Sequence, residues 1–497
     1  MIAVQANTRD FEYDIRSLIK AFYPEQNIKV TVMGEDPPLK KHERADSCSD
    51  PLIFTLAVYL EETSISMSLF YDVIMFQEEY HVFESRDPKE IKNELKTMLY
   101  GILSKQSGKK LPWGTLTGIR PTKIPMAMLE EGKNRQEIED YMEKTYHARK
   151  DKVSLTVGIA EYELSILKAT DSDDGYSIYI GIPFCPSTCL YCSFTSYPIS
   201  KWENEIESYL EALFKEIDFT AQAFQDRKLN TIYIGGGTPT TLLPHQLEML
   251  MEKLESVFDI SALKEFTVEA GRPDSITVEK LQVLKEHRVS RISINPQTMK
   301  QETLEIIGRK HTPQETVAAF RMARSLGFDN INMDLIIGLP GEELADVERT
   351  MEAIRELDPD SITVHSLAIK RAARLNMQWE NYQDLKFENT EEIINMTAKS
   401  AKEMGMAPYY LYRQKNMAGN FENVGYAKPG KEGLYNILIM EERQPIIALG
   451  AGASTKIVFR DEDRIERIEN VKDVKNYIER IDEMIERKQA FIEHNVF

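Results

Sequence analysis

Cysteine is scarce in this sequence, and so are the features typical of secreted, membrane and nucleic-acid-binding proteins. Four cysteines in 497 residues are too few for a disulfide framework. No apolar run reaches membrane-spanning length, and the first residues lack the basic and long apolar regions of a signal peptide. The 61 basic side chains are outnumbered by 80 acidic ones, and the net charge of -19 opposes non-specific nucleic-acid binding. We therefore predict a cytoplasmic protein with no membrane span and no nucleic-acid partner.

Three of the four cysteines are clustered. Cys185, Cys189 and Cys192 fall within eight residues, whereas Cys48 lies far upstream. The apolar run from 178 to 182 predicts a strand that leads into the cluster. Pro183 and Pro186 lie on either side of the pair Phe184 and Cys185. These prolines disfavour a helix through Cys185. The thiols are therefore expected on a loop that leaves a strand end.

The spacing C-x3-C-x2-C limits the metal chemistry. A structural zinc site needs four ligands, and no histidine lies between His147 and His245. A cubane iron–sulfur cluster held by three thiolates instead leaves one iron open to a small molecule. The alternative is three buried cysteines on one helix face, because spacings of four and three share a face.

Several motifs resemble those of a known family. The segment CPSTCLYC resembles the signature of radical S-adenosylmethionine (SAM) enzymes. The leader YIGIPFC and the later segments GGGTPT, VEA, INPQT and MDLIIGLPGE resemble the oxygen-independent coproporphyrinogen III oxidase family, in particular its HemZ-type branch. The resemblance covers roughly Tyr176 to Ser454. It implies a partial (β/α)6 barrel, a [4Fe-4S] cluster and one or two SAM molecules.

The same resemblance implies an activity and its partners. It points to an oxidoreductase of porphyrin and haem biosynthesis that converts two propionates of coproporphyrinogen III to vinyl groups by oxidative decarboxylation. An external electron donor and an electron acceptor are then required. The alternative within the family is a haem-binding chaperone without oxidase activity.

The strand and helix patterns divide the chain into three predicted domains. Residues 1–170 read as a small α+β domain of unknown role, with antiparallel strands near 28–33, 52–60 and 64–74 and a helix over 88–105. Residues 171–375 alternate six strands with helices, which predicts a parallel sheet with helices outside. Residues 376–497 form a C-terminal extension. The stretch GILSKQSGKK is expected to be a linker, because its glycines are too far apart for a phosphate loop.

The motifs of the second domain follow the predicted strand ends, where barrels of this kind gather their chemistry. By resemblance, the cluster ligands are Cys185, Cys189 and Cys192. The residues expected to contact SAM are Tyr179, Tyr191, Gly236, Gly237, Thr238, Glu269, Gln297, Arg309, Asp334 and Ala368. Taken singly, each of these polar residues is open to a structural role, and GGGTP is also compatible with an ordinary strand-to-helix turn.

Substrate recognition rests on a group of cations. Lys370, Arg371 and Arg374 follow the sixth predicted strand, and arginine binds carboxylates well because its planar fork meets both oxygens. The alternative is a solvated basic face. Two departures from the oxidases bear on the substrate: Phe194 stands where many of them have another cysteine, as in the haem-chaperone branch, and Tyr435 replaces a histidine of a C-terminal motif.

Overall fold

The computed structural model describes residues 1–34, 51–71, 74–82, 87–118, 120–170, 175–194, 196–370, 373–382, 384–413, 421–459, 462 and 464–495. The chain forms two compact units. The first holds Met1–Gly158 together with Arg413, and the second begins at Ile159. No helix in the described ranges is both long and apolar enough to cross a membrane. The predicted boundaries at 170 and 375 stay predictions.

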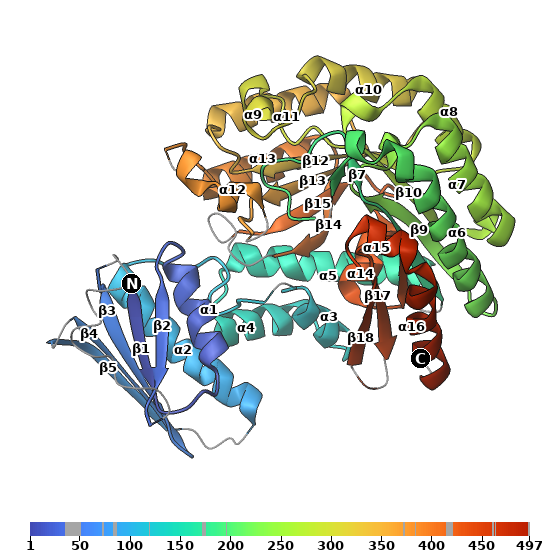
Figure 1. Cartoon of the computed structure of the whole chain (residues 1–497). Helices are drawn as coiled ribbons and strands as arrows, with labels where there is room; N and C mark the ends of the chain where they lie inside the picture. The colour runs from blue at the N-terminus through green and yellow to red at the C-terminus, as the bar shows by residue number, and fades with distance from the viewer. Residues whose placement is uncertain are drawn as a thin grey trace. The chain divides into compact units, whose positions relative to one another are not determined.

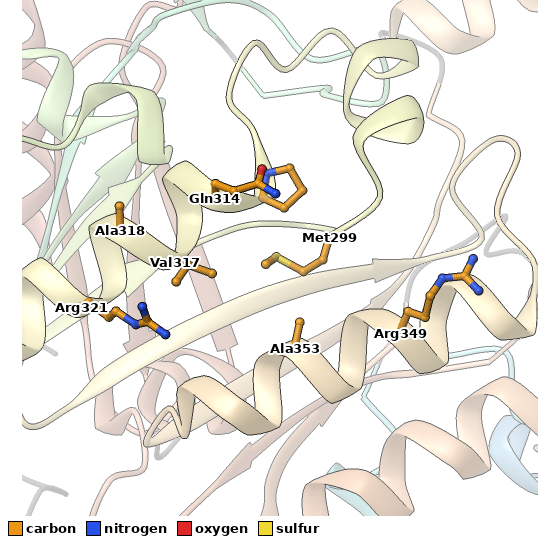
Figure 2. Close-up of a pocket in the computed structure, with 8 residues that line it drawn as sticks. Met299, Gln314, Val317, Ala318, Arg321, Arg349 and Ala353 are labelled. Carbon is orange, nitrogen blue, oxygen red and sulfur yellow. The ribbon is translucent and has the colours of Figure 1, made fainter.

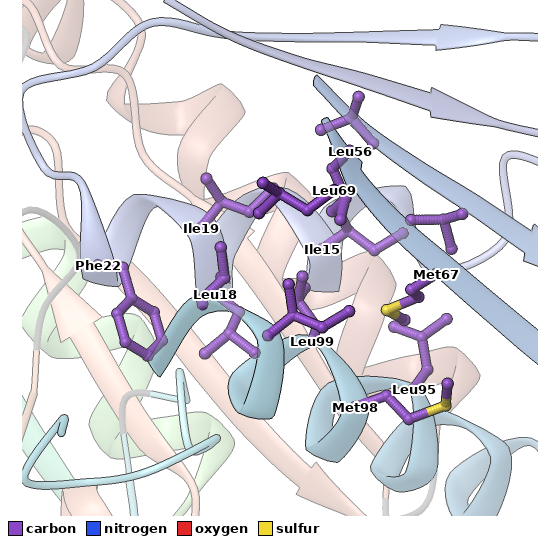
Figure 3. Packing of buried hydrophobic residues seen from close by; sticks show 14 of the residues in the cluster. Ile15, Leu18, Ile19, Phe22, Leu56, Met67, Leu69, Leu95, Met98 and Leu99 are labelled. Carbon is purple, nitrogen blue, oxygen red and sulfur yellow. The ribbon is translucent and has the colours of Figure 1, made fainter. Parts of the chain in front are cut away.

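The first unit is a five-stranded sheet with two helices on one face. Its order is β2 (Ile28–Val32), β1 (Ile2–Ala6), β3 (Phe54–Leu60), β4 (Ser64–Tyr71) and β5 (Ile74–Val82). Helices α1 (Glu12–Phe22) and α2 (Pro88–Ser107) bury apolar side chains such as Leu18 and Leu99 against Leu56 (Figure 3). Helices α3 (Lys123–Glu130), α4 (Arg135–Tyr146) and α5 (Lys150–Thr170) follow.

Two expectations for this region were wrong. Strand β2 was expected to be antiparallel, but it pairs in parallel with β1, which is also parallel to β3. The N-terminal strand β1 therefore lies between β2 and β3. The stretch 101–107 was expected to be part of a linker, but it is the last two turns of α2, which ends at Gly108 in the left-handed conformation that glycine adopts easily.

The second unit is built on six parallel strands, each followed by helical segments. The strands are β6 (Tyr176–Ile182), β9 (Leu229–Gly236), β10 (Glu265–Gly271), β11 (Arg291–Ile294), β12 (Ile331–Ile337) and β13 (Ser361–Ser366), and they are neighbours in chain order. The outer helices are α6 (Ile206–Ala223), α7 (Pro244–Val257), α8 (Val278–Glu286), α9 (Gln301–Ile306), α10 (Pro313–Ser325) and α11 (Leu344–Leu357). Figure 1 shows them as an arc outside the strands.

Further strands extend this sheet at both ends and leave it open. On one side β15 (Asn423–Ala427) pairs antiparallel with β13 and then with β14 (Ala407–Tyr412). On the other side β16 (Ile446–Leu449) is parallel to β6 and is followed by β17 (Ser454–Phe459) and β18 (Arg464–Glu469). The remaining helices are α12 (Arg374–Met377), α13 (Glu391–Glu403), α14 (Leu434–Glu441), α15 (Val474–Glu479) and α16 (Ile481–His494). The predicted fold, a partial (β/α)6 barrel with an N-terminal α+β region and a C-terminal extension, is confirmed.

A buried ion pair joins the C-terminal extension to the barrel. The side chain of Glu216 on α6 is fully buried and accepts hydrogen bonds from Lys488 on α16 and from Tyr477, whose hydroxyl is 2.6 Å away. The backbone N–H of Gly450 and the amide of Asn470 also donate to it, each at 2.8 Å. All these groups compensate for burial of the charges.

We expect Lys488→Met to destabilise the protein by ~3–5 kcal/mol, because it leaves the Glu216 carboxylate buried without its cation. The measurement is the urea midpoint followed by circular dichroism. The control is Lys475→Met, at a side chain that is 74% exposed on α15. The double variant Glu216→Gln with Lys488→Met should recover part of the loss, and equal midpoints for the two lysine variants would contradict the expectation.

Candidate functional site

The three clustered cysteines lie on a loop, as predicted. The chain leaves β6 through Pro183, forms the two-residue strand β7 (Phe184–Cys185) paired with β8 (Tyr197–Pro198), and contains no helix between 183 and 194, all of which are described. The alternative of three cysteines on one helix face is therefore excluded. Neighbouring segments hold the loop in place: the N–H of Leu190 donates to the Ile307 carbonyl at 2.9 Å, and the Leu190 carbonyl accepts the N–H of Leu375 at 2.9 Å.

Three thiols on this loop are available to an iron–sulfur cluster. Cys189 is buried, Cys185 and Cys192 are half-buried, and none forms a disulfide. Burial raises the pKa of Cys185 to about 11 and also raises that of Cys192. A [4Fe-4S] cluster binds each thiolate to a different iron, and three thiolates leave one iron open.

The glycine segment packs directly on the cysteine loop. The N–H of Gly237 donates to the Ile182 carbonyl at 2.8 Å, and that of Thr238 donates to the Phe184 carbonyl at 2.7 Å. A β-carbon on Gly237 would lie 2.5 Å from the Phe184 oxygen, so only glycine fits. At Gly236, φ is +103° and a β-carbon would approach the Tyr179 hydroxyl. The lack of side chains at Gly236 and Gly237 therefore allows this segment to pack closely on the end of β6 and the cysteine loop.

Thr238 links this segment to a cluster ligand. Its hydroxyl lies 3.5 Å from the Cys185 sulfur and donates to it. The threonine is 2% exposed, which keeps the contact away from solvent. A hydrogen bond to a ligating sulfur is one of the interactions that tune an iron–sulfur cluster.

Glu269 lies near the end of β10, beside a stack of tyrosine rings inside the barrel. It accepts a hydrogen bond from the Tyr233 hydroxyl at 2.5 Å. The Tyr233 ring stacks on Tyr435, with centroids 4.5 Å apart, and on Tyr179, at 6.2 Å. Burial raises the pKa of Glu269 to about 7, the Tyr233 hydrogen bond lowers it, and the nearby Asp334 raises it. Sequence reasoning missed Tyr233, because nothing local marks which strand residues face the interior.

Asp334 on β12 behaves in the opposite way. Asn332 donates to its Oδ1 at 2.7 Å, and the Nε2 of His365 lies 3.9 Å from its Oδ2. Burial alone would raise the pKa of Asp334, but the interactions with His365 and Asn332 outweigh burial and hold the pKa below its usual value. His365 is itself placed by Tyr412, whose hydroxyl is 3.1 Å from Nδ1. The site therefore contains one carboxyl group that titrates near neutrality and one that stays ionised.

Gln297 and Arg309 are buried beside the same strand ends. Gln297 is 7% exposed and adopts φ +68°, and its backbone N–H donates to the Asp334 carbonyl at 3.0 Å. Arg309, also 7% exposed, donates from Nη1 to the Asn295 carbonyl at 2.5 Å and interacts with Cys189 and Tyr191. Its Nε has no partner among the described residues. A buried donor without a partner is a place where a ligand carboxylate fits.

The residues expected to meet the substrate are more exposed. Lys370 is exposed, and its ammonium lies 5.8 Å from the centre of the Phe194 ring. Ala368, which was expected to contact SAM and not the substrate, is half-buried after β13. Arg374 donates to the Thr188 carbonyl at 3.3 Å, so it also touches the cysteine loop. Arg371 lies outside the described residues, as does Cys48.

An open groove on the second unit lies away from these residues. It has a volume of about 500 Å³ and runs between α10 and α11, lined by Met299, Pro313, Gln314, Val317, Ala318, Arg321, Arg349 and Ala353 (Figure 2). None of the predicted site residues lines it. The candidate site is therefore the strand-end region that contains the cysteines and carboxylates.

Comparison with known proteins identifies the superfamily and the relatives of this chain. Residues 179–354 match the radical SAM superfamily. The chain is 38% identical to the oxygen-independent coproporphyrinogen-III oxidase-like protein HemZ of Bacillus subtilis over 91% of its own length and 92% of that protein. It is 35% identical to the heme chaperone HemW of Bacillus subtilis, covering 62% of this chain and 76% of that one. The solved coproporphyrinogen III oxidase HemN of Escherichia coli is 24% identical, covers 65% of this chain and 73% of its own, and has a TM-score of 0.51, which shows the shared fold.

The fold and the site define a radical SAM protein, whose cofactors are a [4Fe-4S] cluster and SAM. Within that superfamily, the chain belongs to the family of HemZ-like, oxygen-independent coproporphyrinogen-III oxidase-like proteins.

We expect Cys185→Ala, Cys189→Ala and Cys192→Ala each to abolish the brown cluster chromophore and SAM cleavage. Each variant removes one of the three thiolates that would bind the irons of the cluster. Cys48→Ala should leave both unchanged. Absorption spectra and iron content after anaerobic reconstitution provide the measurement. Full iron loading of the Cys185→Ala protein would contradict the ligand assignment.

We expect SAM affinity to increase as the pH rises through about 7, since the ionised Glu269 carboxylate accepts hydrogen bonds from hydroxyls better than the neutral acid does. Glu269→Gln should bind SAM about tenfold more weakly, equivalent to ~1.4 kcal/mol, with no such pH step. Anaerobic calorimetry on the reconstituted protein measures both.

Tyr233→Phe is the matched variant for this pH step. The Tyr233 hydrogen bond lowers the pKa of Glu269, so its removal should move the step to higher pH. An identical pH dependence in Glu269→Gln and the unmodified protein would disprove the role of this carboxyl group.

Proposed function

We propose that this protein is a radical SAM oxidoreductase that decarboxylates two propionates of coproporphyrinogen III to vinyl groups. The single observation that carries the proposal is the connected set of SAM-handling residues at the strand ends. Within the second unit, contacts or shared partners connect the members of this set, which are the cysteine loop, the glycine segment, Glu269, Arg309 and Asp334. The 38% identity with the oxidase-like protein HemZ over almost the whole chain supports it.

In this proposal, Cys185, Cys189 and Cys192 ligate the cluster. SAM contacts Tyr179, Tyr191, Gly236, Gly237, Thr238, Glu269, Gln297, Arg309 and Asp334, and Ala368 faces a second SAM molecule. The unpartnered Nε of Arg309 would donate a hydrogen bond to a carboxylate of the ligand, and Glu269 would accept hydrogen bonds from ribose hydroxyls. Several buried aromatic rings would exclude water from the place where the reaction occurs.

The reaction balances with two external partners. When bound, the reduced cluster and SAM would supply a radical that can remove one hydrogen atom from the β-carbon of a propionate, with methionine and 5'-deoxyadenosine as the other products. The carboxylate then leaves as carbon dioxide, and one electron passes to an acceptor, so that a vinyl group remains. An electron donor and an electron acceptor are therefore proposed partners.

The proposed substrate contacts combine an aromatic ring with cations. Phe194 is 72% exposed directly after the cysteine loop, with the Lys370 ammonium near its ring. One pyrrole ring of the tetrapyrrole would pack on this ring while the propionates meet Lys370 and Arg374. Arg371 is kept in the proposal on its position in the sequence.

The second candidate is a haem chaperone that keeps the cluster and the SAM site. It is supported by the 35% identity to HemW of Bacillus subtilis, whose name describes that role. A carrier would bind haem tightly and pass it to an acceptor protein without changing its mass.

The test is an anaerobic reaction of reconstituted protein with coproporphyrinogen III, SAM and a reductant, analysed by mass spectrometry. We expect 5'-deoxyadenosine together with products lighter by one and two carbon dioxide units and the hydrogens removed with them. Tight haem binding and transfer, with no change in product mass, would overturn the oxidase in favour of the carrier, even if SAM were cleaved.

Lys370→Ala tests the substrate surface. We expect a roughly fivefold higher KM for coproporphyrinogen, the size of one exposed charge contact of about 1 kcal/mol, with unchanged SAM affinity. Lys399→Ala, at a side chain 78% exposed on α13, is the control. Arg374→Ala should weaken substrate binding too, but it also breaks the contact with Thr188 and is the less specific variant.

A further inference from the structure

A buried arginine clamps the cysteine loop from the end of β10. Arg272 follows Gly271 and is 2% exposed. Its Nε donates to Asp274 Oδ1 at 2.9 Å and its Nη2 donates to Oδ2 at 2.7 Å, which is a two-point contact between guanidinium and carboxylate. Such a pair is geometrically specific and compensates for the burial of both charges.

The remaining arginine nitrogen reaches into the cluster-binding segment. Nη1 donates to the Ser187 carbonyl at 3.1 Å and to its hydroxyl oxygen at 2.7 Å. Ser187 stands between Cys185 and Cys189, and its own hydroxyl donates to the Gly308 carbonyl at 2.8 Å. The side chain of Arg272 therefore uses all three nitrogens, two on its anion and one on the loop.

The positive charge of Arg272 acts on the ligands. Its guanidinium is hydrogen-bonded to Ser187, which lies two residues from both Cys185 and Cys189. A positive charge held at this loop favours the more negative state of a cluster bound there. Net charge, hydrogen bonds and burial are the quantities that set the reduction potential of an iron–sulfur cluster.

We propose that Arg272, oriented by Asp274, is a positioning residue that fixes Ser187 in the cysteine loop and raises the reduction potential of the cluster. Reduction adds negative charge near the guanidinium, which stabilises the reduced state. Asp274 opposes this effect, because its carboxylate contacts the guanidinium at two nitrogens and partly neutralises its charge. The pair thus sets how strong an electron donor must be, whichever tetrapyrrole the protein acts on.

The pair makes opposite predictions for its two members. Arg272→Met removes the cation and leaves the Asp274 carboxylate, so the midpoint potential of the cluster should fall. A tenfold change in the reduction equilibrium corresponds to 59 mV for one electron, and we expect a shift of about this size. Asp274→Asn keeps a hydrogen-bond acceptor but removes the anion, so the potential should rise.

The measurement is a redox titration of the reconstituted full-length protein without SAM, followed by electron paramagnetic resonance. Arg272→Lys retains the charge without the fork and should restore most of the potential while binding the loop less well. Shifts of the same sign in Arg272→Met and Asp274→Asn, or no shift in either, would overturn the proposal, because damage to the loop alone does not depend on the sign of the charge removed.

Two controls separate the effect from misfolding. Arg324→Met breaks an ion pair with Asp360, before the N-terminal end of β13, and should leave the potential unchanged. Iron and sulfide contents are compared for every variant. If Arg272→Met holds no cluster, the comparison of Asp274→Asn with Arg272→Lys still decides: a potential in Asp274→Asn that is not above that of the unmodified protein refutes the proposal.

Discussion

The site depends on a strand pairing that continues beyond the end of the sheet. Strands β6 and β9 pair in parallel up to Ile182 and Gly236. Beyond this point, the backbone N–H groups of Gly237 and Thr238 donate hydrogen bonds to the carbonyls of Ile182 and Phe184. The backbone of the glycine segment therefore holds the start of the cysteine loop at a fixed distance. A side chain at Gly237 would push these segments apart, so the three thiols are positioned by main-chain geometry.

Inside the barrel, Glu269 and Asp334 have different surroundings, and their pKa values shift in opposite directions. Glu269 faces tyrosine rings and receives one hydroxyl, so its charged form is poorly solvated and its pKa rises. Asp334 receives an amide and faces His365, so its charged form is stabilised and its pKa falls. Opposite shifts in neighbouring carboxyl groups allow one site to hold a fixed anion beside an acceptor that responds to pH.

Local patterns in the sequence predicted the elements and the loop that carries the cysteines, but not the partners inside the barrel. The apolar runs of β6 to β13 and the prolines around Cys185 act over a few residues, so both the strands and the loop could be predicted. The pairing of Tyr233 with Glu269 and the stacking of Tyr435 join residues from different strands and a distant helix. The parallel pairing of β2 was missed for the same reason, since it depends on the strand at the N-terminus.

The division between main-chain and side-chain control explains why one family can contain proteins named as oxidases and as haem chaperones. The residues proposed to contact SAM are fixed by strand ends and by buried hydrogen bonds, and changing them would disturb the sheet. The surface proposed for the tetrapyrrole instead consists of an exposed ring and exposed cations on segments after the cysteine loop and after β13. Such positions can change without cost to the fold. We therefore propose that these few side chains decide between releasing a changed substrate and passing on an unchanged one. The cluster, and its proposed tuning by Arg272 and Asp274, would then be common to both.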